Sequence, residues 1–184
     1  MKPLLLFDSV TLRRGGRLLF EGLDLKVGPG EALHVTGPNG SGKSSLIRLA
    51  AGLLRAEAGR VNRDGKVALT DENLALDRDL PLRKALRLWI PYYPLDRGLE
   101  IMGIDGLAHV PVRLLSTGQA RKASLARVVA SDAKIWLLDE PLNGLDAEGF
   151  GRLALVIDSH RRSGGAVLAA SHNPLAGDWA ELGL

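Results

Sequence analysis

The sequence predicts an α/β fold with a parallel central sheet, and three observations support this class. Apolar runs of strand length alternate with helical patterns along much of the chain, an order that places helices over parallel strands. Two of the runs, Ile135 to Leu138 and Ala166 to Ala170, are too continuously apolar for strands that face solvent. A glycine-rich segment, Gly37 to Ser45, separates another apolar run from a helical pattern. Strand, loop and helix in this order are typical of a phosphate-loop NTPase core.

The N-terminal part, up to Thr70, contains short predicted strands and one helix. Alternating apolar residues at Leu23, Leu25 and Val27 indicate a half-buried second strand. The helix is predicted over Leu46 to Leu54, after the glycine-rich segment. The predicted strands are Leu4 to Leu12, Leu18 to Val27, Ala32 to Thr36, a short one at Val61, and Val67 to Thr70.

Residues 71–118, approximately, are predicted to form a small helical insertion. Prolines divide this segment into short helical pieces, among them Leu82 to Trp89 and Asp96 to Met102. After it, Gly118 to Ser131 and Glu148 to Arg162 have the periodicity of amphipathic helices. We find no internal repeat and no linker, so residues 1–184 are predicted to form one domain.

Composition excludes several functional classes. The 184 residues are 46% hydrophobic and 24% charged, as in an ordinary globular domain. The absence of cysteine excludes disulfides and thiolate metal sites and fits a reducing cytosol. No apolar run has the length of a membrane span, so any membrane connection is expected through a partner. The formal charge of +3 is scattered along the chain, which argues against a nucleic-acid partner.

The glycine-rich segment matches the pattern of a phosphate-binding loop. Its glycines allow a tight turn that directs backbone N–H groups at an anion. In such a loop Lys43 reaches the β- and γ-phosphates, and the Ser44 hydroxyl binds Mg²⁺. We therefore expect ATP and Mg²⁺ as ligands. The nucleotide-binding residues predicted here are Gly37, Asn39, Gly40, Ser41, Gly42, Lys43, Ser44 and Ser45.

Two adjacent carboxylates follow the apolar strand Ile135 to Leu138. Ligands gather at the carboxyl ends of parallel strands, so Asp139 and Glu140 are expected beside the loop. Asp139 would hold Mg²⁺ through water. Glu140 would polarise the water that attacks the γ-phosphate, the role of a general base.

Two further signals have alternative interpretations. Leu115 to Gln119 precedes an amphipathic helix, so Ser116 is either an ordinary helix cap or part of an anion site at the helix N-terminus. His172 follows the strand Ala166 to Ala170. On its own, a histidine at a strand end is more often a satisfied surface residue than a functional one.

Together these motifs resemble the nucleotide-binding domain of ABC transporters over nearly the whole chain. The resemblance implies a core with a parallel sheet, an N-terminal antiparallel β subdomain and the helical insertion. It assigns His172 to the γ-phosphate, where it orients Glu140 and water. It also implies a head-to-tail dimer of two copies closing on two ATP molecules, in which Ser116, Gly118 and Gln119 of one copy complete the other's site. The matching segments are Gly37 to Ser45, Leu115 to Gln119, Ile135 to Pro141, Asn143 to Asp146 and Ser171-His172.

Within this family the chain is similar to the ATP-binding subunits of the haem-handling complex of cytochrome c maturation. The similarity implies an ATPase that drives a haem-handling step of c-type cytochrome biogenesis. Its partners would be a CcmB-like permease subunit and a CcmC-like subunit, and it would lie peripherally on the cytoplasmic face of the bacterial inner membrane. The segments that carry the similarity are Gly30 to Leu54, Arg14 to Arg17 with Leu19-Phe20, Thr117, Ile135 to Leu138, and Gly164 to Pro174.

Two positions depart from the family pattern. Asn73 stands where the family has a glutamine that reaches Mg²⁺ and the attacking water, and asparagine is one methylene shorter. Arg14 replaces the aromatic residue that stacks on adenine, and a guanidinium can also stack on a base. We keep both as candidate site residues, Asn73 for catalysis and metal binding and Arg14 for nucleotide binding.

The helical insertion and the family leave two questions open. Trp89, Tyr92 and Tyr93 form either the small core of the insertion or part of a groove for a helix of the membrane partner. The function has two alternatives, a transporter motor for another substrate and a soluble ABC ATPase. The identity of the permease that co-purifies with the chain would distinguish the first alternative from the haem-handling motor. A second cassette or a concentrated basic patch would indicate the second, and the sequence has neither.

Overall fold

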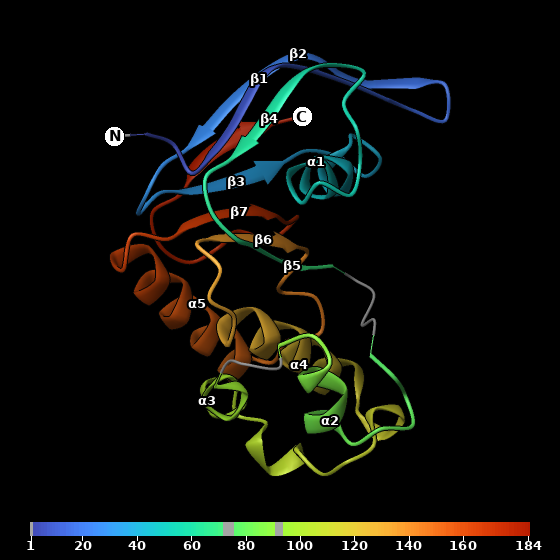
Figure 1. Cartoon of the computed structure of the whole chain (residues 1–184), viewed down its shortest axis with the longest axis vertical. Helices are drawn as coiled ribbons and strands as arrows, with labels where there is room; N and C mark the ends of the chain where they lie inside the picture. Colours follow the sequence, from blue (N-terminus) through green and yellow to red (C-terminus); the bar gives the residue numbers. More distant parts are fainter. Residues whose placement is uncertain (1, 72–75, 91–93) are drawn as a thin grey trace.

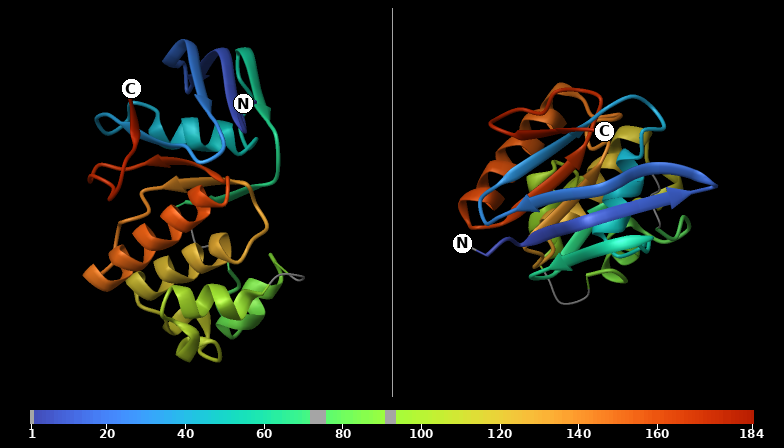
Figure 2. Two further views of the ribbon diagram at one scale, coloured as in Figure 1. Left: turned by 90° about the vertical axis from the view of Figure 1, so that its left-hand side faces the viewer. Right: turned by 90° about the horizontal axis from the view of Figure 1, so that it is seen from above.

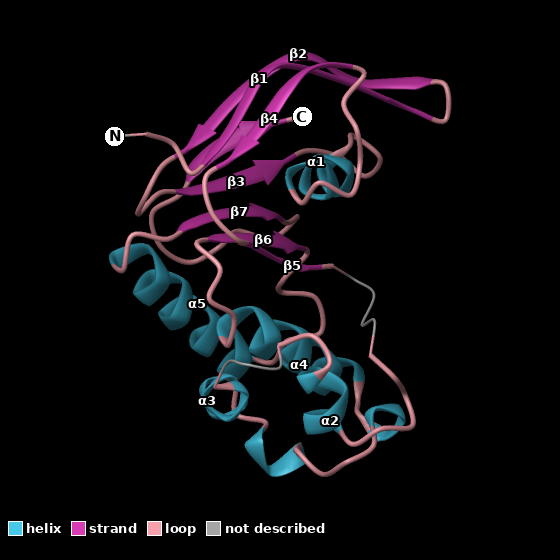
Figure 3. Cartoon of the chain, in the orientation of Figure 1, coloured by secondary structure: helices cyan, strands magenta, loops and turns pink. Residues whose placement is uncertain are grey.

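The computed structural model describes residues 2–71, 76–90 and 94–184, and this part contains two sheets (Figures 1 and 3). An antiparallel sheet in the order β2-β1-β4 consists of β1 (Leu5–Arg14), β2 (Arg17–Val27) and β4 (Ala58–Arg63). A parallel sheet in the order β5-β6-β7-β3-β8 consists of β3 (Ala32–Thr36), β5 (Val67–Thr70), β6 (Ile135–Asp139), β7 (Ala166–Ala170) and β8 (Ala180–Gly183). The predicted α/β class with a parallel central sheet and an antiparallel β subdomain is confirmed.

The helices lie on both faces of the parallel sheet. Figures 1 and 2 show α1 (Lys43–Ala50) between the two sheets, and α4 (Thr117–Val129) and α5 (Ala147–Arg162) on the opposite face. The helices α2 (Leu82–Arg87) and α3 (Leu95–Ile101) pack beyond α4, followed by short 3₁₀ helices at Asp105–Leu107 and Val112–Leu114. None of the described helices has the length and apolar character that a membrane crossing requires.

Strand β6 explains why the molecule has two hydrophobic cores. Its side chains alternate between faces, and all of its residues are buried. Ile135 and Leu137 pack with α1 and the antiparallel sheet. Trp136 and Leu138 pack with the helical layer on the other face. The uninterrupted apolar run therefore reflects a strand that is covered on both sides.

Some elements differ from the sequence prediction. Helix α1 begins at Lys43, inside the glycine-rich segment, and not at Leu46. Strand β8 was not predicted, because its four residues are mostly exposed and it forms by pairing with the distant β3. The side chain of Trp89 is 51% exposed, so the interpretation of this residue as core is wrong. Tyr92 and Tyr93 lie outside the described residues.

Candidate functional site

The glycine-rich segment forms a loop between β3 and α1. Gly37 and Gly42 have φ angles of +139° and +115°, which side chains other than glycine rarely allow. Gly42 is also the N-cap residue of α1, so the first N–H groups of the helix open at the end of the loop. Such an N-terminus favours an anion because its N–H groups are unpaired and the helix dipole is positive there.

Lys43 and Ser41 make this loop suitable for binding a polyphosphate. The Lys43 side chain is buried, and its Nζ donates to the carbonyl oxygens of Gly37 at 2.7 Å and Pro38 at 3.1 Å. The ammonium group is thereby held on the loop itself. The Ser41 hydroxyl is buried, and the described residues offer it no hydrogen-bond partner. A phosphate oxygen would supply the missing partner, so the loop suits the expected ligand.

Ser44 and Asp139 place two oxygen donors side by side. The Ser44 hydroxyl, in the first turn of α1, donates to Oδ1 of Asp139 at 3.0 Å. Asp139 ends β6 and is only 2% exposed. Hydroxyl and carboxylate oxygens are the hard ligands that Mg²⁺ prefers, so this pair fits the predicted metal.

Glu140 and His172 meet at the ends of two neighbouring strands. Glu140 has a φ of +46°, uncommon for a residue with a side chain, and its N–H donates to the carbonyl oxygen of Ala170 at 2.8 Å. Its Oε1 lies 3.2 Å from Nε2 of His172, and Oε2 accepts the His172 N–H at 3.4 Å. The side chain of Glu140 is 8% exposed and that of His172 is 44% exposed. Left-handed backbone is frequent at functional sites, and here it accompanies a carboxylate directed at a histidine.

Most of these residues lie around one cavity of about 520 Å³. The loop, Glu140 and His172 contribute to its lining, and the hairpin between β1 and β2 contributes Arg14. The Arg14 Nη1 donates to the Ser45 hydroxyl at 3.3 Å. The structure therefore brings together the predicted residues of the loop, the Asp–Glu pair, His172 and Arg14. Asn73 lies outside the described residues.

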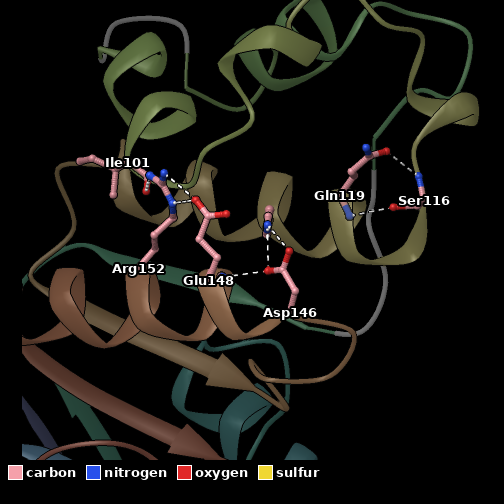
Figure 4. A network of polar contacts seen from close by, with 8 residues as sticks. Ile101, Ser116, Gln119, Asp146, Glu148 and Arg152 are labelled. Carbon is pink, nitrogen blue, oxygen red and sulfur yellow. Dashed lines mark hydrogen bonds and ion pairs between the residues drawn. The ribbon is translucent and has the colours of Figure 1, made fainter.

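Ser116, Gly118 and Gln119 lie elsewhere, in a second cavity of about 610 Å³. Ser116 caps α4 through two reciprocal hydrogen bonds with Gln119 (Figure 4). The Ser116 hydroxyl accepts the Gln119 N–H at 3.3 Å, and Gln119 Oε1 accepts the Ser116 N–H at 2.9 Å. A side chain at Gly118 would place a Cβ only 2.6 Å from the carbonyl oxygen of Gly144. Glycine is thus required at position 118 for close packing.

Asp146 connects the second cavity with α5. Its carboxylate accepts the Gly149 N–H at 2.8 Å, which caps α5, and pairs with Lys122 of α4 at 2.9 Å. The hydrogen bond from Lys122 is the main cause of an Asp146 pKa below its ordinary value. Arg152 of α5 pairs with Glu148 at 2.8 Å and donates to the Ile101 carbonyl oxygen at 3.0 Å (Figure 4). The helices around Ser116 are therefore tied to one another by polar contacts.

Two residues near the first cavity were not predicted as site residues. Asn143 lies in the turn after β6 and lines this cavity. His34 was interpreted only as a core or edge residue of its strand. It is 5% exposed, and its Nε2 lies 3.0 Å from the carbonyl oxygen of Ser171, next to His172. The sequence offers no local signal for this contact because the two residues are far apart in the chain.

Comparisons with known proteins agree with this geometry. A family model described as ABC transporter matches residues 20–143. The chain is 55% identical over 181 residues to the cytochrome c biogenesis ATP-binding export protein CcmA of Sphingopyxis alaskensis, covering 96% of this chain and 93% of that protein. The protein of the same name from Novosphingobium aromaticivorans is 54% identical over 172 residues, covering 94% and 90%.

Solved structures show the same fold. A putative ABC transporter ATP-binding protein from Pyrococcus furiosus has a TM-score of 0.84 at 19% identity, covering 98% of this chain and 96% of that one. A dimeric ATP-binding cassette bound to ADP and Pi, in a post-hydrolysis state, has a TM-score of 0.81 at 20% identity, covering 92% and 88%. The fold and the loop thus define a protein of the ABC-type ATPase class. The chain belongs to the ABC transporter family and, within it, to the CcmA group of ATP-binding proteins.

Proposed function

We propose that the chain is the ATP-hydrolysing motor subunit of a membrane ABC transporter complex that drives a haem-handling step of c-type cytochrome biogenesis. The contact between Glu140 and His172 beside the phosphate loop carries the ATPase part of the proposal. The CcmA relatives, which match 96% and 94% of the chain, support the biological setting.

The site residues divide the chemistry among them. The loop N–H groups and Lys43 hold the phosphates, and Ser44 and Asp139 hold Mg²⁺. The metal, when bound, neutralises charge that develops on the phosphates. Glu140 accepts a proton from the attacking water, and His172 fixes the direction of that carboxylate. Buried Asp139 is the last residue of β6 and buried Glu140 follows it, so the sheet fixes the positions of both.

A second copy of the chain completes the site in this proposal. The cavity with Ser116 and Gly118 is separate from the one that contains Lys43 and Glu140. A helix N-terminus with a capping serine is a suitable phosphate ligand only if it can reach the phosphate. Two copies packed head to tail would bring Ser116 of one to the loop of the other, around two ATP molecules. A related cassette forms a dimer with ADP and Pi bound.

The membrane partner is proposed to bind a groove beside α2. This groove has a volume of about 510 Å³ and is lined by Leu53, Trp89 and Arg127, among others. Leu53 and Trp89 are 62% and 51% exposed, and the Arg127 guanidinium carbon lies 4.8 Å from the centre of a Trp89 ring. An exposed apolar surface of this kind suits a short helix of a CcmB-like permease, with a CcmC-like subunit in the assembled complex. The chain would then lie peripherally on the cytoplasmic face of the bacterial inner membrane.

Deletion of the gene followed by haem staining of c-type cytochromes tests the biological role. The deletion strain should lack mature c-type cytochromes, and wild-type protein should restore them. Lys43→Ala should fail to restore them because the loop loses its ammonium group. Lys84→Ala, on the exposed side of α2, is the matched control and should restore them. Normal maturation in the deletion strain would reject the role in cytochrome biogenesis.

Variants in the groove test the coupling to the partner. Trp89→Ala should retain the ATPase rate of the isolated chain but fail in the haem-staining assay. Leu155→Ala, on α5 and 73% exposed, removes an apolar side chain that does not line the groove and should behave as wild type. Equal behaviour of the two variants would reject the groove as the docking surface.

A further inference from the structure

The hairpin between β1 and β2 brings a cation to the nucleotide cavity. Arg14 is the last residue of β1, and Gly15 and Gly16 turn the chain with φ angles of +57° and +79°. Positive φ at both positions gives the tight turn that keeps the hairpin in register. Arg14 and Gly15 consequently line the cavity together with the phosphate-binding loop.

The guanidinium of Arg14 contacts the first turn of α1. Its Nη1 donates to the hydroxyl of Ser45, which is 6% exposed and directly follows Ser44. The N-terminus of a helix is partly positive, so a guanidinium beside it is repelled unless an anion lies between them. Arg14 is therefore placed where phosphate oxygens would be stabilised by the guanidinium and the helix together.

The charges around the cavity also favour a phosphate ligand. Arg14 and Lys43 both line it, and Glu140 is the one carboxylate in the described lining, with buried Asp139 behind Ser44. A second hairpin cation, Arg17, lies over the loop: its Nη1 is 3.8 Å from the point that a Cβ on Gly40 would occupy. This excess of positive charge attracts a polyphosphate irrespective of the base that it carries.

The cavity lacks a platform for a purine base. In the part of the chain that the structure describes, its lining contains no phenylalanine, tyrosine or tryptophan, and Leu19 is the large apolar residue there. Arg14 could itself stack on a base, but its guanidinium is directed at Ser45. Stacking would require the side chain to leave this hydrogen bond.

We propose that Arg14 binds the phosphate chain of the nucleotide and not its base, so that this ATPase selects for a triphosphate with little discrimination between purines. The inference rests on the proposed function, because it presupposes that the cavity binds a nucleoside triphosphate. It extends that function by widening the substrate class from ATP to purine nucleoside triphosphates. The arginine at position 14, in place of an aromatic residue, would thus bind phosphate and leave the base weakly selected.

Calorimetric titration of the purified chain with ATP, GTP and inorganic tripolyphosphate tests the proposal. Wild-type protein should bind ATP and GTP with similar affinity. Arg14→Ala should weaken all three ligands by a similar factor, on the order of tenfold to a hundredfold, as expected for a hydrogen bond to a charged group. Arg14→Gln is a second variant with the same expectation, and thermal unfolding verifies that both variants fold.

Arg13 provides the matched control. It is exposed, as Arg14 is, but its guanidinium pairs with Glu57 at 3.4 Å and it is not among the residues that line the cavity. Arg13→Ala should leave the three affinities unchanged. Loss of ATP affinity without loss of tripolyphosphate affinity in Arg14→Ala would overturn the proposal in favour of base stacking. Unchanged affinity for all three ligands would overturn it as well, while leaving the ATPase role intact. Failure of the wild-type protein to bind any of them would reject the proposed function itself.

Discussion

The Oε1 atom of Glu140 lies 3.2 Å from Nε2 of His172, although the two residues belong to the ends of different strands. This contact makes Glu140→Gln the sharpest test of the chemistry, since the amide keeps the size of the side chain but cannot accept a proton. Loss of a general base costs about 10²- to 10⁴-fold in rate. We expect phosphate release to fall by that factor at saturating ATP, while the dissociation constant for ATP stays near the wild-type value.

The same variant should accumulate the closed dimer. With ATP bound and not hydrolysed, gel filtration of Glu140→Gln should shift toward a species of twice the mass. Glu148→Gln removes a charge from a surface ion pair with Arg152 and serves as the control, with near wild-type turnover. If Glu140→Gln hydrolysed ATP at the parental rate, Glu140 would not be the base.

His34 is expected to act as a positioning residue for the turn that carries His172. Its Nε2 lies 3.0 Å from the carbonyl oxygen of Ser171, and both residues are buried. His34→Leu removes this contact and should lower the turnover number by about tenfold, the scale of one hydrogen bond, with little change in ATP affinity. His34→Gln, whose amide can still donate, should recover much of the rate. A purely structural role would instead lower the unfolding temperature of both variants without separating turnover from affinity.

Two glycines near α5 should respond to alanine in opposite directions. A Cβ at Gly165 would collide with Nε2 of His160, whose ring stacks on Trp136 with centroids 3.9 Å apart. Gly165→Ala should therefore reduce the free energy of unfolding by about 1–3 kcal/mol, as overpacking does. Gly151 lies within α5 and has open space around it, so Gly151→Ala should increase stability by roughly 0.5–1 kcal/mol. Denaturant titration of the two variants measures both effects, and a stabilising Gly165→Ala would contradict the packing argument.

The elements that sequence reasoning found are those whose cause is local. The loop is recognisable because its glycines, Lys43 and Ser44 are contiguous, and β6 is recognisable because both of its faces are apolar. Strand β8 was missed because its residues carry no periodicity and depend on pairing with β3.

Tertiary contacts explain what was missed at the site. The contact of Arg14 with Ser45 depends on where the hairpin lies over α1, so the sequence suggested only stacking on the base for this residue. The contact of His34 with Ser171 similarly requires β3 and β7 to be neighbours in the sheet. Neither contact could be inferred from the sequence.

His160 should make the stability of the protein depend on pH in the weakly acidic range. Burial lowers the pKa of His160 below its ordinary value, and contacts with the backbone of Lys134 and Ala166 oppose this only in part. The folded state therefore keeps the ring neutral at pH values where the unfolded chain, with a histidine pKa of about 6.5, already binds a proton. The unfolded state then binds more protons, so the free energy of unfolding should fall as the pH drops below about 6.5 and should be unaffected by this group above it.

Replacement of His160 tests this dependence directly. His160→Phe keeps an aromatic ring against Trp136 but cannot titrate. Its free energy of unfolding should therefore decline less than that of the wild type between about pH 7.5 and about pH 5.5. Denaturant titration of both proteins at these two pH values measures the difference. Leu155, which is 73% exposed and has no titratable group, provides the control, and Leu155→Ala should retain the wild-type slope. Equal slopes for His160→Phe and the wild type would mean that another group causes the acid sensitivity, because removal of a depressed histidine pKa must flatten the curve.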